Sequence, residues 1–138
     1  MKGTTSVRTR RVKKDLYENY LKKARESLAS ARESLNAERL NAATINAIHS
    51  GISACDALTV FMLGVRHAGE RHEDAITLLQ TLSLPRDVLS VKGRQLSRLL
   101  EIKNAAEYEE RLITQKESTE AVRDAERFLE WVEELLRK

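Results

Sequence analysis

The apolar positions of the chain recur with a helical period along almost its whole length. The longest such stretch runs from residue 40 to residue 64, contains no proline and has Asp56 as its one charged residue. It has two apolar faces: the larger side chains are Ile45, Ile48, Ile52 and Cys55, and the mostly small ones are Ala43, Ala47, Gly51, Ala54, Leu58 and Phe61. A helix that is apolar on two faces belongs inside a bundle. Polar residues interrupt it too often for a membrane span.

Four further helices are predicted around this central one. The first runs from Asp15 to Asn36, and a short one runs from about His72 to Leu82. The fourth begins at Pro85, a residue favoured in a first helical turn, and runs to about Glu110. Thr114 and Glu117 have the spacing of a capping box and mark the start of the last helix.

The expected inward-facing residues of the last two long helices follow from this period. They are Val88, Val91, Leu96, Leu99, Ile102 and Ala106 in the fourth helix, and Ala121, Ala125, Phe128, Val132 and Leu135 in the last. No segment alternates with period two, so no sheet is expected. The predicted fold is all-α, an up-and-down four-helix bundle with one additional short helix.

The charge is unevenly distributed. Of the 24 lysines and arginines, six lie in residues 1–14, which contain no acid, so the other 18 stand against 21 acidic residues. We expect residues 1–14 to form a flexible basic arm and residues 15–138 a single helical domain. The arm offers candidate contacts to a nucleic-acid backbone: Arg8, Arg10, Arg11, Lys13 and Lys14. A solvated terminus without a ligand is the alternative.

A polar stripe follows the third face of the central helix. It consists of Asn46, His49, Ser53 and Asp56, at spacings of three, four and three residues. His49 could be a base or switch whose pKa a nearby carboxylate tunes. The alternative is a hydrogen-bonded histidine in or beside the core.

Other chemistry is sparse. The sequence has no glycine-rich phosphate loop, no CxxC pair and no HExxH motif, so no cofactor and no metal are expected. His67 and His72 are predicted to be solvated residues of a loop and a helix start rather than metal ligands. Cys55, the only cysteine, is predicted to be a buried structural thiol. A single cysteine cannot form a disulfide within the chain, which fits a cytoplasmic protein.

Residues 99–108 read LLEIKNAAEY, and together with three other segments they give the chain a resemblance to the HEPN domain family. This is a small helical family found in RNA-cutting toxins, nucleotidyltransferase partners and antiviral systems. The first helix resembles the pattern YLxKAxExLxxA of the family. The segment AERLNAATINAIHSGISACDALTVFMLG resembles its alanine-rich second helix, and RHEDAITLL resembles its short helix beginning at histidine. The resemblance extends from about Leu16 to Leu136 and implies the family's fold and its homodimer.

The chain departs from the family at the nuclease motif. Nuclease members carry arginine, a polar residue, three further residues and then histidine, where this sequence has Lys103, Asn104 and Tyr108. Lysine can bind a phosphate only as a point charge, and tyrosine is a poor general base at neutral pH. The candidate site is a shallow polar groove of these three residues, joined by His49 and Asp56 from the central helix. Alternatively, Lys103 only extends from the edge of the core and Tyr108 only packs its ring at the helix end.

The resemblance therefore implies a non-catalytic HEPN-like protein that binds RNA, a nucleotide or a protein partner. A nucleotidyltransferase-type antitoxin is one example of such a protein partner, in a toxin–antitoxin or defence context. One alternative is a metal-independent ribonuclease that uses Lys103 and Tyr108 in place of the family's arginine and histidine. Another is a structural dimerisation or adaptor module. No membrane partner is expected.

Overall fold

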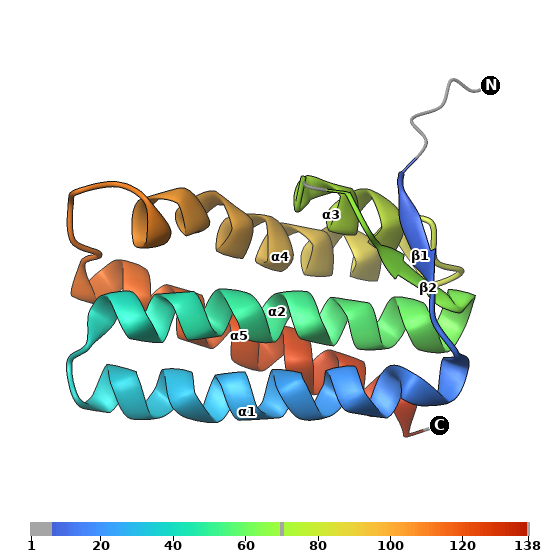
Figure 1. The fold of residues 1–138 in the computed structure, drawn as a ribbon, viewed down its shortest axis with the longest axis horizontal. Helices are drawn as coiled ribbons and strands as arrows, with labels where there is room; N and C mark the ends of the chain where they lie inside the picture. Colours follow the sequence, from blue (N-terminus) through green and yellow to red (C-terminus); the bar gives the residue numbers. More distant parts are fainter. Residues whose placement is uncertain (1–6, 70, 138) are drawn as a thin grey trace.

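The computed structural model describes residues 7–69 and 71–137 of the chain and has the predicted helical architecture (Figure 1). In chain order its elements are β1 (Thr9–Arg11), the 3-10 helix η1 (Lys14–Leu16), α1 (Tyr17–Asn36), α2 (Leu40–Leu63), β2 (Val65–His67), α3 (Glu73–Leu79), α4 (Arg86–Glu107) and α5 (Gln115–Leu136). The four long helices form the bundle, and the short α3 packs beside the beginning of α4. The all-α fold predicted from the sequence is confirmed. Within the described residues, no helix is both long enough and apolar enough to span a membrane.

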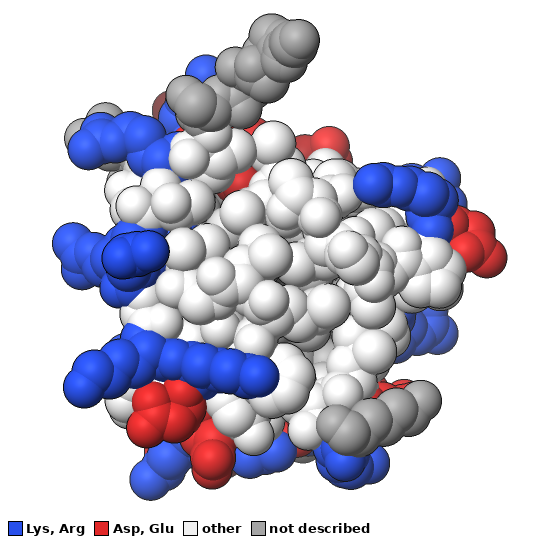
Figure 2. Space-filling view, turned by 90° about the vertical axis from the view of Figure 1, so that its right-hand side faces the viewer, with Lys and Arg blue, Asp and Glu red and all other residues white. Residues whose placement is uncertain are grey.

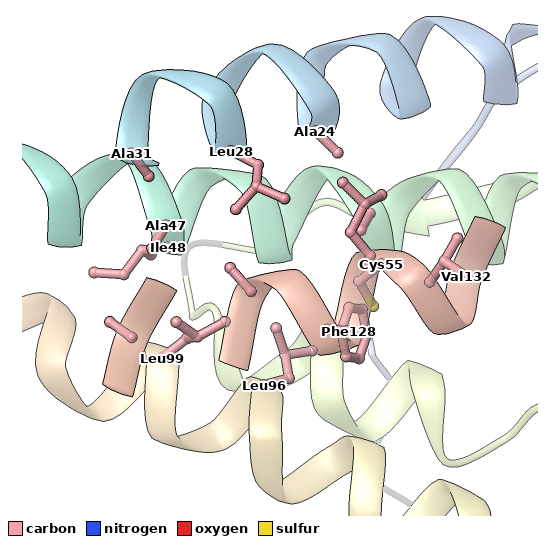
Figure 3. Packing of buried hydrophobic residues seen from close by; sticks show 14 of the residues in the cluster. Ala24, Leu28, Ala31, Ala47, Ile48, Cys55, Leu96, Leu99, Phe128 and Val132 are labelled. Atoms are coloured by element: carbon pink, nitrogen blue, oxygen red, sulfur yellow. The ribbon is translucent and has the colours of Figure 1, made fainter. Parts of the chain in front are cut away.

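The central position predicted for α2 is confirmed, because it packs against α1, α4 and α5. Its small residues allow the neighbouring helices to come close: a Cβ added at Gly51 would lie 2.6 Å from Cδ1 of Leu99 in α4. The buried Ser50 donates its hydroxyl hydrogen to the Ala24 carbonyl of α1 at 2.8 Å, so its burial leaves no unpaired hydroxyl. Figure 3 shows the core between the four helices, with Phe128 of α5 near its centre.

The chain reverses direction where α2 ends. Gly64 has a φ of 72°, in the left-handed region that glycine adopts without strain, and it closes the helix as the sequence predicted. The following residues, Val65–His67, pair antiparallel with Thr9–Arg11. The expectation that the chain has no sheet was therefore wrong. Each strand has only three residues, too few for a period-two pattern to be recognised in the sequence.

One face of α4 differs from the prediction. Val91 was expected to face the core, but 45% of its surface is exposed, and Leu89 is fully buried instead. The reason is the contact with α3: Gln80 donates its side-chain Nε2 hydrogen to the Leu89 carbonyl at 3.1 Å. A Cβ at Gly93 would lie 2.5 Å from that same nitrogen, so the glycine side of α4 faces α3. The helix also ends at Glu107, three residues before the predicted end.

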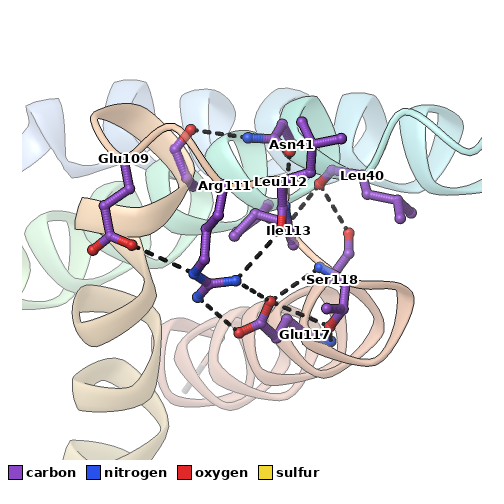
Figure 4. A network of polar contacts seen from close by, with 11 residues as sticks. Leu40, Asn41, Glu109, Arg111, Leu112, Ile113, Glu117 and Ser118 are labelled. Carbon is purple, nitrogen blue, oxygen red and sulfur yellow. Dashed lines mark hydrogen bonds and ion pairs between the residues drawn. The ribbon is translucent and has the colours of Figure 1, made fainter.

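The connection from α4 to α5 is held by polar contacts (Figure 4). Asn41 of α2 donates to the Ala106 carbonyl at 3.2 Å and accepts from the Ile113 backbone N–H at 3.0 Å. Arg111 lies between Glu109 and Glu117, at 3.4 Å and 3.0 Å. Both hydrogen bonds of the predicted capping box at the start of α5 are present. The loop is thereby fixed to α2 on one side and to α5 on the other.

Candidate functional site

A shallow hollow lies where α2, the beginning of α3 and the end of α4 meet. Its volume is about 300 Å³, and it is lined by His49, Ile52, Ser53, His72, Lys103 and Glu107. The structure therefore brings His49 of α2 and Lys103 of α4 to one place, which the sequence left open. The polar stripe of α2 reaches this hollow only with its middle members, because Asp56 is buried further along the helix.

The positive charge of Lys103 is balanced by a carboxylate inside this hollow. Its Nζ lies 2.6 Å from Oε2 of Glu107, one turn further along α4, and about a fifth of each side chain is exposed. The hydrogen bond from Lys103 to Glu107 raises the pKa of the lysine, the largest of the effects on it. The hollow thus contains one cation and one anion in contact, and a phosphate could bind Lys103 only in competition with Glu107.

The other two residues of the degenerate motif do not line the hollow. Tyr108 follows the last residue of α4, and 72% of its surface is exposed. Its ring centroid lies 5.3 Å from the Lys103 ammonium, so the two residues are close, but the hydroxyl is not buried in a site. Asn104 is exposed and donates to Glu109 at 3.3 Å. The groove of Lys103, Asn104, Tyr108, His49 and Asp56 predicted from the sequence is therefore not formed as one cavity in the described structure.

Asp56 belongs instead to a buried contact that the sequence did not indicate. Nδ1 of His67, in β2, lies 3.3 Å from Oδ1 of Asp56, and both side chains are almost fully buried. The prediction that His67 is a solvated loop residue was wrong. The left-handed turn at Gly64 folds β2 back along α2 and places the inward residue of the strand on the carboxylate. This contact attaches the β1–β2 ribbon to the core of the bundle.

His72 connects this buried pair with the hollow. Its ring packs edge-on against that of His67, with 5.9 Å between centroids, and it also lines the hollow. Burial lowers the pKa of His72, and the positive charge of Lys103 lowers it further. The imidazole is therefore kept neutral near pH 7, where it can donate and accept hydrogen bonds but adds no charge.

The ribbon itself gathers basic side chains. Arg10 of β1 faces Arg66 of β2 directly across the strand pair, and facing residues lie on the same side of a ribbon. Because His67 points inward, its neighbour Arg66 points to the other side, and Arg66 is half-buried. The exposed basic residues of the same segment are Arg8, Arg10, Arg11, Lys13 and Lys14. Among the described residues, neither Arg66 nor any of these five has an ion pair with a carboxylate.

Cys55 is buried, as predicted, and its sulfur lies 3.8 Å from the Ala75 carbonyl oxygen. Burial raises the pKa of this thiol strongly, and the neighbouring Asp56 raises it further. The thiol is thus a poor nucleophile. In the part of the chain that the structure describes, no group of three histidine, cysteine, aspartate or glutamate side chains converges as a metal site would require.

Comparison with known proteins agrees with this architecture. The family model of the HEPN domain matches residues 17–135, and the chain therefore belongs to the HEPN domain family. Among solved structures, the chain is similar to the crystal structure of ST0689, an archaeal HEPN homologue. The TM-score is 0.65 at 20% sequence identity, over 86% of this chain and 96% of that one. No protein among the curated ones that were compared matches the chain.

Proposed function

We propose that this HEPN protein binds the phosphate backbone of RNA with its basic ribbon and does not cleave it. The basic ribbon consists of the basic side chains on and next to the β1–β2 strand pair: Arg8, Arg10, Arg11, Lys13, Lys14 and Arg66. The observation that carries the proposal is the direct pairing of Arg10 with Arg66 across the two strands. Like charges that face each other destabilise a strand pair, and a bound polyanion removes that cost.

We propose that the protein does not cleave RNA because of how the residues in and beside the hollow are arranged. The Lys103 ammonium is engaged by Glu107 at 2.6 Å, and His72 is neutral beside it. Tyr108 is exposed, and a tyrosine is a poor general base at neutral pH. A ribonuclease that used Lys103 and Tyr108 would need Lys103 free to hold a phosphate, and this arrangement disfavours it. The third function suggested by the sequence, an adaptor without RNA binding, leaves the facing arginines without a role.

The experiment compares charge-matched variants. Single-stranded RNA with a fluorescent label is titrated with wild-type protein, with Arg10→Gln/Arg66→Gln, and with Arg25→Gln/Arg32→Gln, and binding is followed by anisotropy. The control arginines lie on α1 in ion pairs with Glu133 and Glu126, so the two double variants lose the same formal charge. We expect the ribbon variant to bind more weakly and to lose about 0.7 from the salt slope for each phosphate contact removed. The control variant should keep the wild-type slope.

Two results would refute the proposal. One is wild-type binding that does not weaken with added salt. The other is an equal loss in both double variants, which would mean that only net charge matters.

We also infer that the protein acts as a homodimer, as the resemblance to its family implies. Support comes from the loop between α4 and α5, where 79% of Leu112 and 72% of Tyr108 are exposed although the loop is held in place. Exposed apolar residues on a fixed loop are typical of subunit contacts. Light scattering after gel filtration tests this: we expect Leu112→Glu to yield monomers and Leu16→Glu to leave the dimer intact. A wild-type monomer at all concentrations would refute it.

A cytoplasmic location and a toxin–antitoxin or defence context stay predictions of the sequence.

A further inference from the structure

A second surface of the molecule lies at the end of the bundle where η1 meets the end of α2. Three large apolar side chains are exposed there: Leu16 to 39%, Met62 to 37% and Leu63 to 44%. They come together because η1 packs on α2 and because Phe61 and Tyr17 pack edge-on, with ring centroids 4.9 Å apart. The bundle therefore ends in an apolar surface made by Leu16, Met62 and Leu63, which we call the apolar end.

Basic residues border the apolar end. Figure 2 looks onto this end of the molecule and shows a broad uncharged centre, with lysines and arginines at its margin and fewer aspartates and glutamates among them. Lys13 and Lys14 are exposed and lie three and two residues before Leu16, with the exposed Asp15 between Lys14 and Leu16, and Arg11 ends the neighbouring strand. The Lys14 ammonium lies 4.6 Å from the Phe61 ring centroid, so the lysine stem lies along the apolar surface. The result is an apolar centre with a mainly basic margin.

We propose that the apolar end binds an acidic amphipathic segment of another protein, with apolar residues at its centre and carboxylates at its edge. Exposed apolar residues surrounded by charged ones are the usual composition of a protein interface, and opposite charges at the edge select the partner. RNA does not account for this surface, because phosphates gain nothing from Leu16, Met62 and Leu63. The two surfaces share Arg11, Lys13 and Lys14 at their border, but the apolar centre is not explained by RNA binding.

Two other occupants fit less well. A second copy of the chain would bring one basic margin against another, and like charges across an interface are costly. A lipid surface favours apolar side chains that project into it, whereas more than half of each of these three is covered by its own neighbours. A complementary protein surface suits side chains that lie flat and remain partly exposed.

The test uses a synthetic helical peptide with leucines on one face and glutamates on the other, added to the full ¹⁵N-labelled chain. We expect saturable shifts in the amide signals of Leu16, Met62 and Leu63, with a Kd below about 1 mM. The variant Met62→Gln/Leu63→Gln should raise the Kd about tenfold or more, since it removes the apolar contact. The matched control is Val91→Gln, which replaces an exposed apolar residue of α4 that belongs neither to the apolar end nor to the proposed dimer contact, and it should leave the Kd unchanged.

A second peptide, with lysines in place of the glutamates, tests the charge requirement and should not bind. The proposal is overturned if the glutamate peptide gives no saturable shifts, if its shifts lie elsewhere, or if the lysine peptide binds equally well. It is also overturned if Met62→Gln/Leu63→Gln binds like wild type, because the contact would then be electrostatic only. Vesicles of phosphatidylserine and phosphatidylcholine complete the comparison: binding to them, without binding to the peptide, would assign the surface to lipid. RNA affinity of the Met62→Gln/Leu63→Gln variant should equal that of wild type, which separates this surface from the ribbon.

Discussion

Replacing Asn41 by alanine tests how the end of α4 is held to α2. The Asn41 side chain makes hydrogen bonds to the Ala106 carbonyl and the Ile113 N–H, and both partner residues are buried. Removing it loses two hydrogen bonds of about 1 kcal/mol each and leaves buried backbone groups unpaired, at about 1–3 kcal/mol. The higher helix propensity of alanine returns about 0.5 kcal/mol. We expect the free energy of unfolding to fall by about 2.5–4.5 kcal/mol.

The assay is equilibrium unfolding in urea, followed by circular dichroism, with a thermal melt beside it. The Tm should fall by about 5–12 °C for a chain of this size. Asn46→Ala is the matched control, because Asn46 also makes a side-chain hydrogen bond, to the Ala42 carbonyl of its own helix at 3.0 Å. A local bond of this kind stabilises little, so the control should unfold close to wild type. Equal effects of the two substitutions would contradict the proposed role of Asn41.

Three further predictions concern titration and the hollow. Hydrogen bonds from Arg111 lower the pKa of Glu117 from 4.5 to about 2, so this carboxylate contributes stability above pH 4.5 that is lost as the pH falls towards 2; the stability difference between wild type and Glu117→Gln, measured by urea unfolding, should shrink over that interval, and a constant difference would argue against it. The buried Cys55 should react with a thiol reagent at pH 8 only after urea is added, and rapid labelling of the folded protein would contradict its burial. Lys103→Ala should leave RNA affinity within about twofold of wild type, because the ammonium is already engaged by Glu107, and a large loss would move the RNA site to the hollow.

The parts of the fold that were predicted correctly are those with strong local signals. The central helix ends at Gly64 because only a residue tolerant of a positive φ closes it there, and Thr114 with Glu117 caps α5 through contacts within four residues. Val91 was placed wrongly because it was assigned to one apolar face of the helix together with Val88. The contact of Gln80 with α4 instead buries the face that carries Leu89. Local periodicity does not contain such a tertiary contact.

The candidate site was predicted only in part. Lys103 and His49 share the hollow because both helices present those positions to the same gap. The pairing of His67 with Asp56 depends on how the turn after α2 directs a three-residue strand, and the pairing of Arg10 with Arg66 depends on the register of that strand. Residues 10 and 66 are far apart in sequence, and no local pattern connects them. The basic residues near the N-terminus were identified from charge alone, but their arrangement on a ribbon was not.

The most direct test of the central claim follows binding and cleavage in one sample. Labelled single-stranded RNA is mixed with wild-type protein at low salt, the anisotropy is read, and the RNA is then recovered and sized on a denaturing gel. We predict a rise in anisotropy that added salt reverses, with RNA of unchanged length. If the wild type shortens the RNA while the Lys103→Ala and Tyr108→Phe variants leave it intact, the degenerate motif cuts RNA. If the anisotropy does not change, the ribbon does not bind RNA. Either result would contradict an RNA-binding HEPN protein without nuclease activity.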